Sequence, residues 1–111
     1  MADATPLLVW STFPDEESAR RIARTLVEER LAACANLLPR VESVYRWKGA
    51  VETAAEVWGL FKTTREAYPR LEARLQALHP YELPEIVAFR PEHGLPAYLQ
   101  WIAANAGPAE A

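Results

Sequence analysis

Residues 35–63, ANLLPRVESVYRWKGAVETAAEVWGLFKT, decide the fold of this chain, because they read as one long β-hairpin. The outgoing arm is ANLLPRVESVYRW, the turn is Lys48-Gly49-Ala50, and the returning arm is VETAAEVWGLFKT. At ~3.3 Å per residue the returning arm, Val51 to Thr63, spans about 43 Å. A compact domain of this length has an expected diameter of about 34 Å. The hairpin is therefore predicted to be longer than the body that carries it.

The far end of the hairpin carries apolar side chains that its own body cannot cover. They are Val44, Tyr45, Trp47 and Val51. Because exposed apolar patches mark interaction surfaces, we expect the tip to pair with further copies of the chain, with Tyr45, Trp47 and Val51 in the interface. Trp and Tyr are enriched at such interfaces. Tyr45 and Trp47 can equally stack on a ligand.

Length and composition limit the class of protein. The chain has 111 residues, half of them hydrophobic, which predicts a single packed domain over residues 1–111, with 1–6 and 107–111 as flexible tails. The formal charge of −3 argues against a nucleic-acid partner, which normally needs a clustered basic surface. No apolar run approaches the ~20 residues of a membrane span, so no membrane partner is expected.

Cysteine usage predicts the compartment. Cys34 is the only cysteine, so an internal disulfide is excluded. No charged-then-apolar signal peptide opens the chain. Together these features predict a cytoplasmic protein.

The remaining elements follow from periodicity and capping signals. Residues 7–10 form an apolar run typical of a strand buried on both faces, and residues 85–90 form a second strand. Helices are expected over residues 16–31, with Asp15 as N-cap, from Thr63 or Thr64 to Leu78, and over residues 97–105. In the last helix Tyr98, Trp101 and Ile102 are expected to point inward. Within the hairpin, Pro39 predicts a bend or a bulge, and Gly59 predicts a bulge or a close backbone approach.

The resulting order is β-α-β-β-α-β with an extra C-terminal helix. It predicts an α+β, ferredoxin-like fold, in which one antiparallel sheet carries two helices on one face. Many functions use this fold, so the fold alone does not supply one.

With these elements placed, several motifs are similar to those of one family. They are PDEE at 14–17, ERLAACAN at 29–36, the spaced Ser43, Tyr45, Trp47 and Gly49, KTT at 62–64, HPYELPEI at 79–86 and PAYLQW at 96–101. The chain resembles the CutA family of divalent-cation tolerance proteins over about residues 7–102. The resemblance implies a homotrimer whose hairpins build intersubunit sheets, much as in PII signalling proteins. It also implies a link to heavy-metal tolerance and copper binding, and it supplies no enzyme activity to carry over, so we expect a protein that is not an enzyme.

The same resemblance implies a candidate metal site. The family's proposed copper site uses a thiol at the end of the first strand and neighbouring histidines before the Pro-Tyr. Here Ser11 stands at the thiol position and Leu78 precedes His79, so only His79 is a usual metal ligand. Cys34, the single thiol, is a further candidate ligand for Cu(I). Each has a structural alternative, because His79 can cap a helix end and Cys34 can be a small core residue.

A ligand cleft is expected beside the return arm. Glu56 and Lys62 share one face of this arm by the period-2 rule, together with Trp58 and Leu60. Tyr81, Glu82 and Glu85 lie in or just after the proline-rich loop, where binding groups often occur. We expect no tightly bound cofactor, with copper or another divalent cation as a candidate ligand. The alternative is a PII-like sensor of a small molecule or partner protein with no direct metal site.

The sequence can also be compared with the requirements of two other classes of protein, a thiol enzyme and an RNA-binding module. An enzyme would need Cys34 and His79 within hydrogen-bond reach, oriented by a group such as Glu85, and the sequence does not place them together. An RNA-binding module of the same element order would need a K/R-G-F/Y-type run and a basic surface, and this chain has neither.

Overall fold

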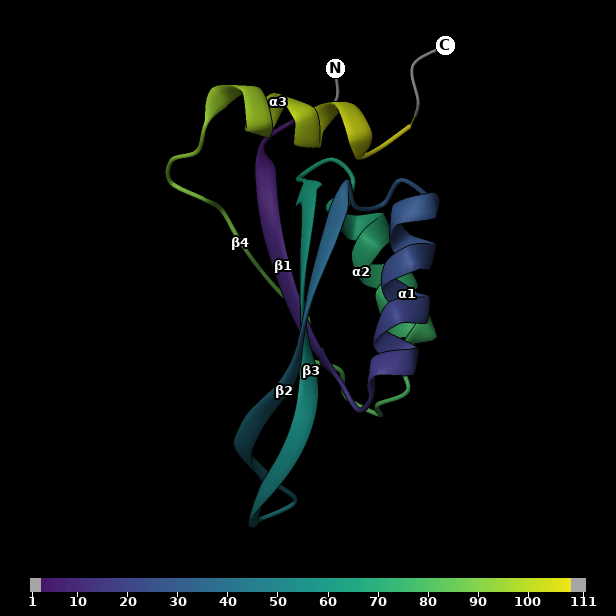
Figure 1. Cartoon of the computed structure of the whole chain (residues 1–111), viewed down its shortest axis with the longest axis vertical. Helices are drawn as coiled ribbons and strands as arrows, with labels where there is room; N and C mark the ends of the chain where they lie inside the picture. Colours follow the sequence, from purple (N-terminus) through teal and green to yellow (C-terminus); the bar gives the residue numbers. More distant parts are fainter. Residues whose placement is uncertain (1–2, 109–111) are drawn as a thin grey trace.

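The computed structural model of the chain describes residues 3–108 and shows one four-stranded antiparallel sheet with the strand order β2-β3-β1-β4. The elements in chain order are β1 (Pro6–Phe13), α1 (Glu16–Glu28), β2 (Cys34–Trp47), β3 (Ala50–Thr64), α2 (Tyr68–Leu78), β4 (Val87–Phe89) and α3 (Pro96–Asn105). Helices α1 and α2 lie side by side on one face of the sheet, and α3 crosses one end of it (Figure 1). This is the predicted ferredoxin-like, α+β arrangement. Of the helices within residues 3–108, none is long and apolar enough to cross a membrane.

The core lies between the sheet and the two helices. Alternate residues of β1 and β3 point to the same side, and the helices bury their apolar stripes against them. The core residues include Val9, Phe13, Ile22, Leu26, Val57, Phe61, Leu71 and Leu75. The prediction that β1 is buried on both faces is only half right. Leu8 and Trp10, on the face without α1 and α2, keep part of their surface exposed.

Helix α1 begins as predicted and ends three residues early. The Asp15 carboxylate accepts a hydrogen bond from the Ser18 N–H at 2.7 Å, which caps the first turn. At the other end Arg30 adopts a φ of +59°, and the Leu31 N–H donates to the Leu26 carbonyl at 2.9 Å. This is a Schellman termination, which needs a left-handed residue directly after the helix. Because glycine usually marks that position, an arginine there carries no recognisable stop signal.

The hairpin has the predicted extent and a tighter turn than predicted. Lys48 and Gly49 alone form the loop, with φ values of +49° and +84°, as a two-residue type I′ turn requires. The predicted bulge is confirmed, since the β2/β3 register shifts between Leu38 and Val41 and Arg40 has a φ of +63°. At Gly59 the register is continuous, so no bulge forms there, and the close approach is made by side chains rather than by backbone. A Cβ on Gly59 would lie 2.9 Å from Phe13 Cε2.

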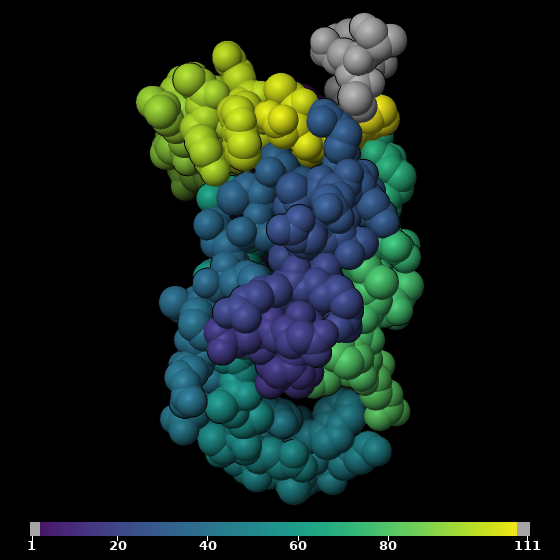
Figure 2. Space-filling model, turned by 45° about the vertical axis from the view of Figure 1, so that its right-hand side comes forward, coloured from purple at the N-terminus to yellow at the C-terminus, as the bar shows by residue number. Residues whose placement is uncertain are grey.

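The distal half of the hairpin projects away from the body. The molecule measures 48 × 26 × 22 Å, and the long dimension runs along the hairpin (Figure 1). In the space-filling view the teal hairpin curves beneath the rest of the chain, with a hollow above it (Figure 2). Val44 and Val51 are 66% and 65% exposed. The predicted overhang is therefore present within one chain.

The C-terminal third differs from the prediction in its details. Thr64 ends β3 and its hydroxyl accepts from the Ala67 N–H at 3.2 Å, so α2 begins four residues later, at Tyr68. Strand β4 is limited to three residues because only these pair with β1. In α3 the inward position of Ile102 is confirmed. The inward positions of Tyr98 and Trp101 are wrong, since these side chains are 39% and 43% exposed.

Parts of the expected flexible tails are held in place. Pro6 belongs to β1, and the Thr5 carbonyl accepts from the Arg65 N–H at 2.8 Å. The Gly107 N–H donates to the Arg30 carbonyl at 2.6 Å. The rest of the two tails, residues 1–2 and 109–111, lies outside the described residues.

Candidate functional site

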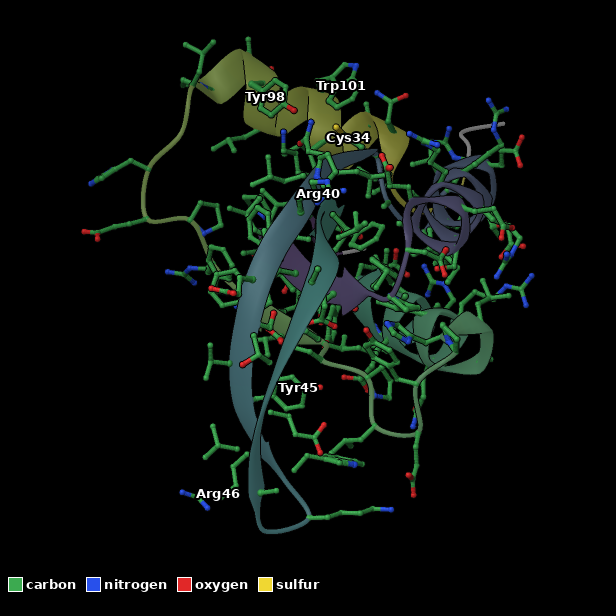
Figure 3. All side chains as sticks on the ribbon, turned by 60° about the horizontal axis from the view of Figure 1, so that its bottom comes forward. Cys34, Arg40, Tyr45, Arg46, Tyr98 and Trp101 are labelled. Atoms are coloured by element: carbon green, nitrogen blue, oxygen red, sulfur yellow. The ribbon has the colours of Figure 1, made fainter. Side chains whose placement is uncertain are left out.

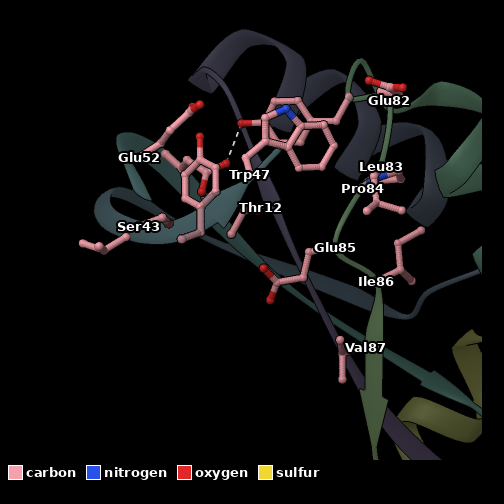
Figure 4. A pocket seen from close by; sticks show the side chains of 14 residues that line it. Thr12, Ser43, Trp47, Glu52, Glu82, Leu83, Pro84, Glu85, Ile86 and Val87 are labelled. Carbon is pink, nitrogen blue, oxygen red and sulfur yellow. Dashed lines mark hydrogen bonds between the residues drawn. The ribbon is translucent and has the colours of Figure 1, made fainter. Parts of the chain in front are cut away.

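A cleft of ≈ 880 Å³ opens between the distal hairpin, the end of β1 and the loop that leads into β4. Among the residues that line it, Trp47 comes from the hairpin and Glu85 from the loop (Figure 4). Its polar and aromatic lining comes from four segments: Thr12 of β1, Ser43, Tyr45 and Trp47 of β2, Glu52 and Glu56 of β3, and Tyr81, Glu82 and Glu85 of the loop. This volume lies within the range of small-molecule sites.

The register of the hairpin sets one wall of the cleft. Tyr45 pairs directly with Glu52, so their side chains are cross-strand neighbours on one face. Glu52 and Glu56 share that face by strand alternation, as does Trp58, which pairs with Thr12 of β1. The face is the one that α1 and α2 leave open. A strand pattern and a two-residue turn are therefore enough to bring these groups together.

A hydrogen bond from the loop to the hairpin closes the inner end of the cleft. The Tyr81 hydroxyl donates to Glu56 Oε2 at 2.5 Å, as drawn in Figure 4. Burial, and then the bond to the Glu56 carboxylate, raises the pKa of Tyr81 above its ordinary value. Tyr81 therefore stays protonated near neutrality and remains a donor to Glu56. Glu56 itself is only 9% exposed.

His79 fixes the base of the same loop. As the residue that ends α2, it donates its backbone N–H to the Leu75 carbonyl at 2.9 Å. Its ring stacks on Phe13, with centroids 4.9 Å apart. Nδ1 accepts from the Tyr81 N–H at 3.1 Å, so the hydrogen must sit on Nε2, which donates to the Thr12 carbonyl at 2.8 Å. Burial lowers the pKa of His79, which favours this neutral tautomer.

Comparison with known proteins identifies the family. Residues 7–105 match the model of the CutA1 divalent ion tolerance protein family. The chain belongs to the CutA family. It is 51% identical over 100 residues to the divalent-cation tolerance protein CutA of Thermus thermophilus, covering 90% of this chain and 97% of that one.

Solved CutA structures agree with the fold. The Thermus thermophilus structure matches with a TM-score of 0.89 at 50% identity, covering 92% of this chain and 99% of the other. The Xylella fastidiosa CutA structure gives a TM-score of 0.89 at 47% identity, covering 93% and 99%. Mouse CutA is 45% identical over 91 residues, or 82% of this chain, which spans only 51% of that longer relative.

The CutA-type metal set is not assembled in this chain. Ser11 is fully buried on the helix-covered face of β1, and both ring nitrogens of His79 already have backbone partners. Cys34 of β2 pairs with Lys62, which pairs with Leu8 of β1. Leu8 is four residues along β1 from Thr12, the residue that contacts His79, an offset of about 13 Å along the strand direction. Because β3 lies between β2 and β1, Cys34 is farther from that contact than this offset alone. Among residues 3–108, no group of three His, Cys, Asp or Glu residues is placed to hold a metal ion.

The same spacing separates the thiol from the histidine for catalysis. Cys34 lies near α3, at the end of the sheet remote from Tyr45 on the distal hairpin (Figure 3). Its sulfur contacts Asn36 Oδ1 at 3.8 Å and is half-buried rather than part of the core. The Cys34–His79 pair considered for nucleophilic catalysis is therefore not within hydrogen-bond reach.

Three of the four predicted cleft residues line the CutA cleft, and one does not. Glu56, Tyr81 and Glu85 are present. Lys62 needs correction, because it lies six residues along β3 from Glu56, about 20 Å away. It donates instead to the Tyr98 hydroxyl at 3.0 Å, which places it under α3. The face of Lys62 was predicted correctly, but face alone does not give position along the strand.

Other lining residues were not predicted from the sequence, among them Thr12, Ser43 and Glu52. The signal for Glu52 was present in the hairpin. Once Lys48-Gly49 is taken as a two-residue turn, the register places Glu52 opposite Tyr45. Thr12 becomes a neighbour of the cleft only through the path of the loop after His79, which has no periodic signal.

Proposed function

We propose that this CutA-family chain acts in divalent-cation tolerance as a cytoplasmic homotrimer that binds a ligand rather than catalysing a reaction. Its relatives carry the name divalent-cation tolerance protein, which supports the physiological role. The separation of Cys34 from His79 supports binding over thiol catalysis. A single free cysteine fits a reducing cytoplasm.

The observation that carries the assembly is the exposed distal hairpin. Val44 and Val51 stand in water within a single chain, at 66% and 65% exposure. In the described sheet the two outer strands, β2 and β4, each have one edge without a strand partner. Open edges next to apolar side chains favour pairing with another chain, and a β2-to-β4 contact repeated around a threefold axis closes a ring.

Sedimentation equilibrium at micromolar concentration tests this proposal. The wild-type chain is expected to sediment with three times the mass of one chain. Val51→Asp places a charge in the proposed interface and is expected to weaken association. Val27→Asp is the matched control, since Val27 is 37% exposed on α1, outside the hairpin, and is expected to leave the mass unchanged. A wild-type chain that sediments as a monomer contradicts the proposal.

The metal part of the function has two forms. In the first, copper or another divalent cation binds the protein directly. In the second, the protein is a PII-like sensor with no direct metal site. The occupied nitrogens of His79 favour the second form for the family's histidine position.

Titrations of Cu(I) and Cu(II) against the parent, His79→Ala and Cys34→Ser separate these forms. We expect His79→Ala to bind as the parent does. Binding that is lost only in Cys34→Ser supports a direct Cu(I) site at the half-buried thiol. Binding that is absent in the parent supports the sensor form.

A further inference from the structure

We propose that α3 is a strap that opens and closes as one unit on the end of the sheet, and that Arg30 is the latch that holds it closed. Opening leaves the main core between the sheet, α1 and α2 intact, and it uncovers Ala33 and Lys62. The proposal concerns the body of one chain and does not involve the distal hairpin or its cleft.

Helix α3 adds little to the packing of the body. Of its ten residues only Ile102 is buried. Ile102 packs with Ala33, Leu99 and Ala106 in a small cluster that is separate from the main core. An element with few buried apolar contacts opens at a lower free energy than the core that carries it. The packing of α3 therefore favours local opening over joint unfolding with the rest of the chain.

The segment that leads into α3 holds its first turn only weakly. β4 ends at Phe89 and the helix begins at Pro96, and residues 92–95 between them are all exposed. Figure 1 shows this segment bowing away from the sheet before it reaches the helix. In the described chain, one hydrogen bond joins the first turn to the body, from Lys62 Nζ to the Tyr98 hydroxyl at 3.0 Å. This bond is exposed to solvent, so it holds the first turn only weakly.

Arg30 holds the other end of the helix. Its Nε donates to the Gly107 carbonyl and its Nη2 to the Ala104 carbonyl, each at 2.8 Å. The Arg30 carbonyl accepts from the Gly107 N–H at 2.6 Å. The last carbonyls of a helix have no partner within it, and α3 has no basic residue in its last turn. One residue of the body thus supplies the cation and the donors that the C-terminal end of α3 lacks.

The backbone of Arg30 indicates that its side chain is needed at this position. Its φ of +59° lies in the left-handed region, which favours glycine. Glycine would end α1 equally well, since it is the usual residue after a Schellman termination. What arginine adds, at the cost of an unfavourable backbone conformation, is the side chain that reaches α3. Substitution can therefore separate the two roles of Arg30, which are to end α1 and to latch α3.

Hydrogen exchange of the full-length protein in its native assembly, followed by mass spectrometry, tests the proposal. In the wild type we expect amides of α3 to exchange faster than those around Phe61 and Leu71 in the core. Arg30→Gly removes the latch and keeps the backbone conformation. It is expected to speed exchange in α3 about tenfold or more, because hydrogen bonds from a charged donor are lost. Core amides should change less, because glycine at this φ relieves backbone strain and offsets part of the loss.

Two further variants separate the latch from a general effect of charge. Arg30→Lys keeps the charge but lacks the planar group that reaches both carbonyls, so exchange in α3 should fall between wild type and Arg30→Gly. It is also the deciding variant if Arg30→Gly does not fold. Arg24→Ala removes an exposed arginine of α1 that pairs with Glu28, and this matched control is expected to exchange as wild type.

Three results would overturn the proposal. In the first, α3 and core amides of the wild type exchange together, as they would if a sister chain held the helix down. In the second, exchange in α3 is unchanged in Arg30→Gly, or in Arg30→Lys where the glycine variant does not fold. In the third, Arg24→Ala speeds exchange in α3 as much as the change at Arg30 does.

Discussion

The two halves of the β2–β3 hairpin share one ladder and have opposite surroundings. In its proximal half, β3 packs against β1 and the helices, and Val57 and Phe61 on the helix-covered face are buried. The distal half, around Val44 and Val51, is paired only with itself and remains exposed. The same strand is thus a core element at one end and an unsatisfied surface at the other. The difference indicates that the chain folds around the proximal half, and it supports the proposal that the distal half serves assembly.

The largest effect is expected where the proximal half meets the core. Phe61→Ala removes a fully buried ring that packs edge-on against Phe13 at 6.2 Å. The loss of burial and the cavity are expected to lower the free energy of unfolding by about 3–5 kcal/mol, measured by urea unfolding. Val27→Ala on the exposed side of α1 is the control and should change it by less than about 0.5 kcal/mol. A small loss for Phe61→Ala would show that the proximal half is not the folding core.

The next effect comes from a glycine in the proximal half. In Gly59→Ala the new Cβ would meet Phe13 Cε2 at 2.9 Å and Phe61 Cε2 at 3.3 Å. Since both rings are fully buried, we expect overpacking to cost about 1–3 kcal/mol of unfolding free energy, measured as a shift of the urea midpoint. An unchanged midpoint would mean that the two rings move aside freely.

The same substitution in the distal turn should act through the backbone alone. At Gly49 no atom lies within 4 Å of an added Cβ, but φ is +84°. Gly49→Ala is expected to cost about 1 kcal/mol through left-handed strain, and urea unfolding beside Gly59→Ala ranks the two positions. A larger loss at Gly49 than at Gly59 would contradict the assignment of the core to the proximal half.

The smallest effect is a pH dependence of the unfolding free energy, caused by His79 at the base of the loop that lines the cleft. Burial lowers the pKa of His79 below its ordinary value of 6.5, so the unfolded chain binds this proton more readily. The stability from neutral His79 is complete above pH 6.5 and is lost as pH falls from 6.5 through the folded-state pKa. Unfolding measured between about pH 5 and 8 should show this decline in the parent and lack it in His79→Gln. An identical decline in both would assign it to other groups.

Much of the fold was predictable because it rests on local patterns. The N-cap Asp15 and the apolar stripe predict helix α1. The long extended run and the turn residue Gly49 predict the hairpin. The failures occur where tertiary context decides. Arg30 ends α1 in a conformation that glycine usually supplies. Tyr98 and Trp101 were assigned inward because α3 is apolar around most of its surface, so its periodicity does not select a buried side.

The site was predictable only in part, for a geometric reason. Strand alternation correctly predicted that Glu56 and Lys62 share a face. It could not predict that Lys62 lies under α3, far from the cleft. The contact between Tyr81 and Glu56 joins residues 25 positions apart through an irregular loop. Nothing in the local sequence encodes the path of this loop, and this path decides which carboxylates line the cleft together.

Hydrogen exchange of the assembled protein tests the central claim most directly, because it reports both halves of the hairpin in one measurement. If sister chains cover the distal half, amides around Val44 and Val51 exchange slowly at high concentration and faster on dilution, while those around Phe61 stay protected throughout. Distal amides that exchange rapidly at every concentration, beside a protected proximal half, would contradict the claim that the overhang exists to be covered.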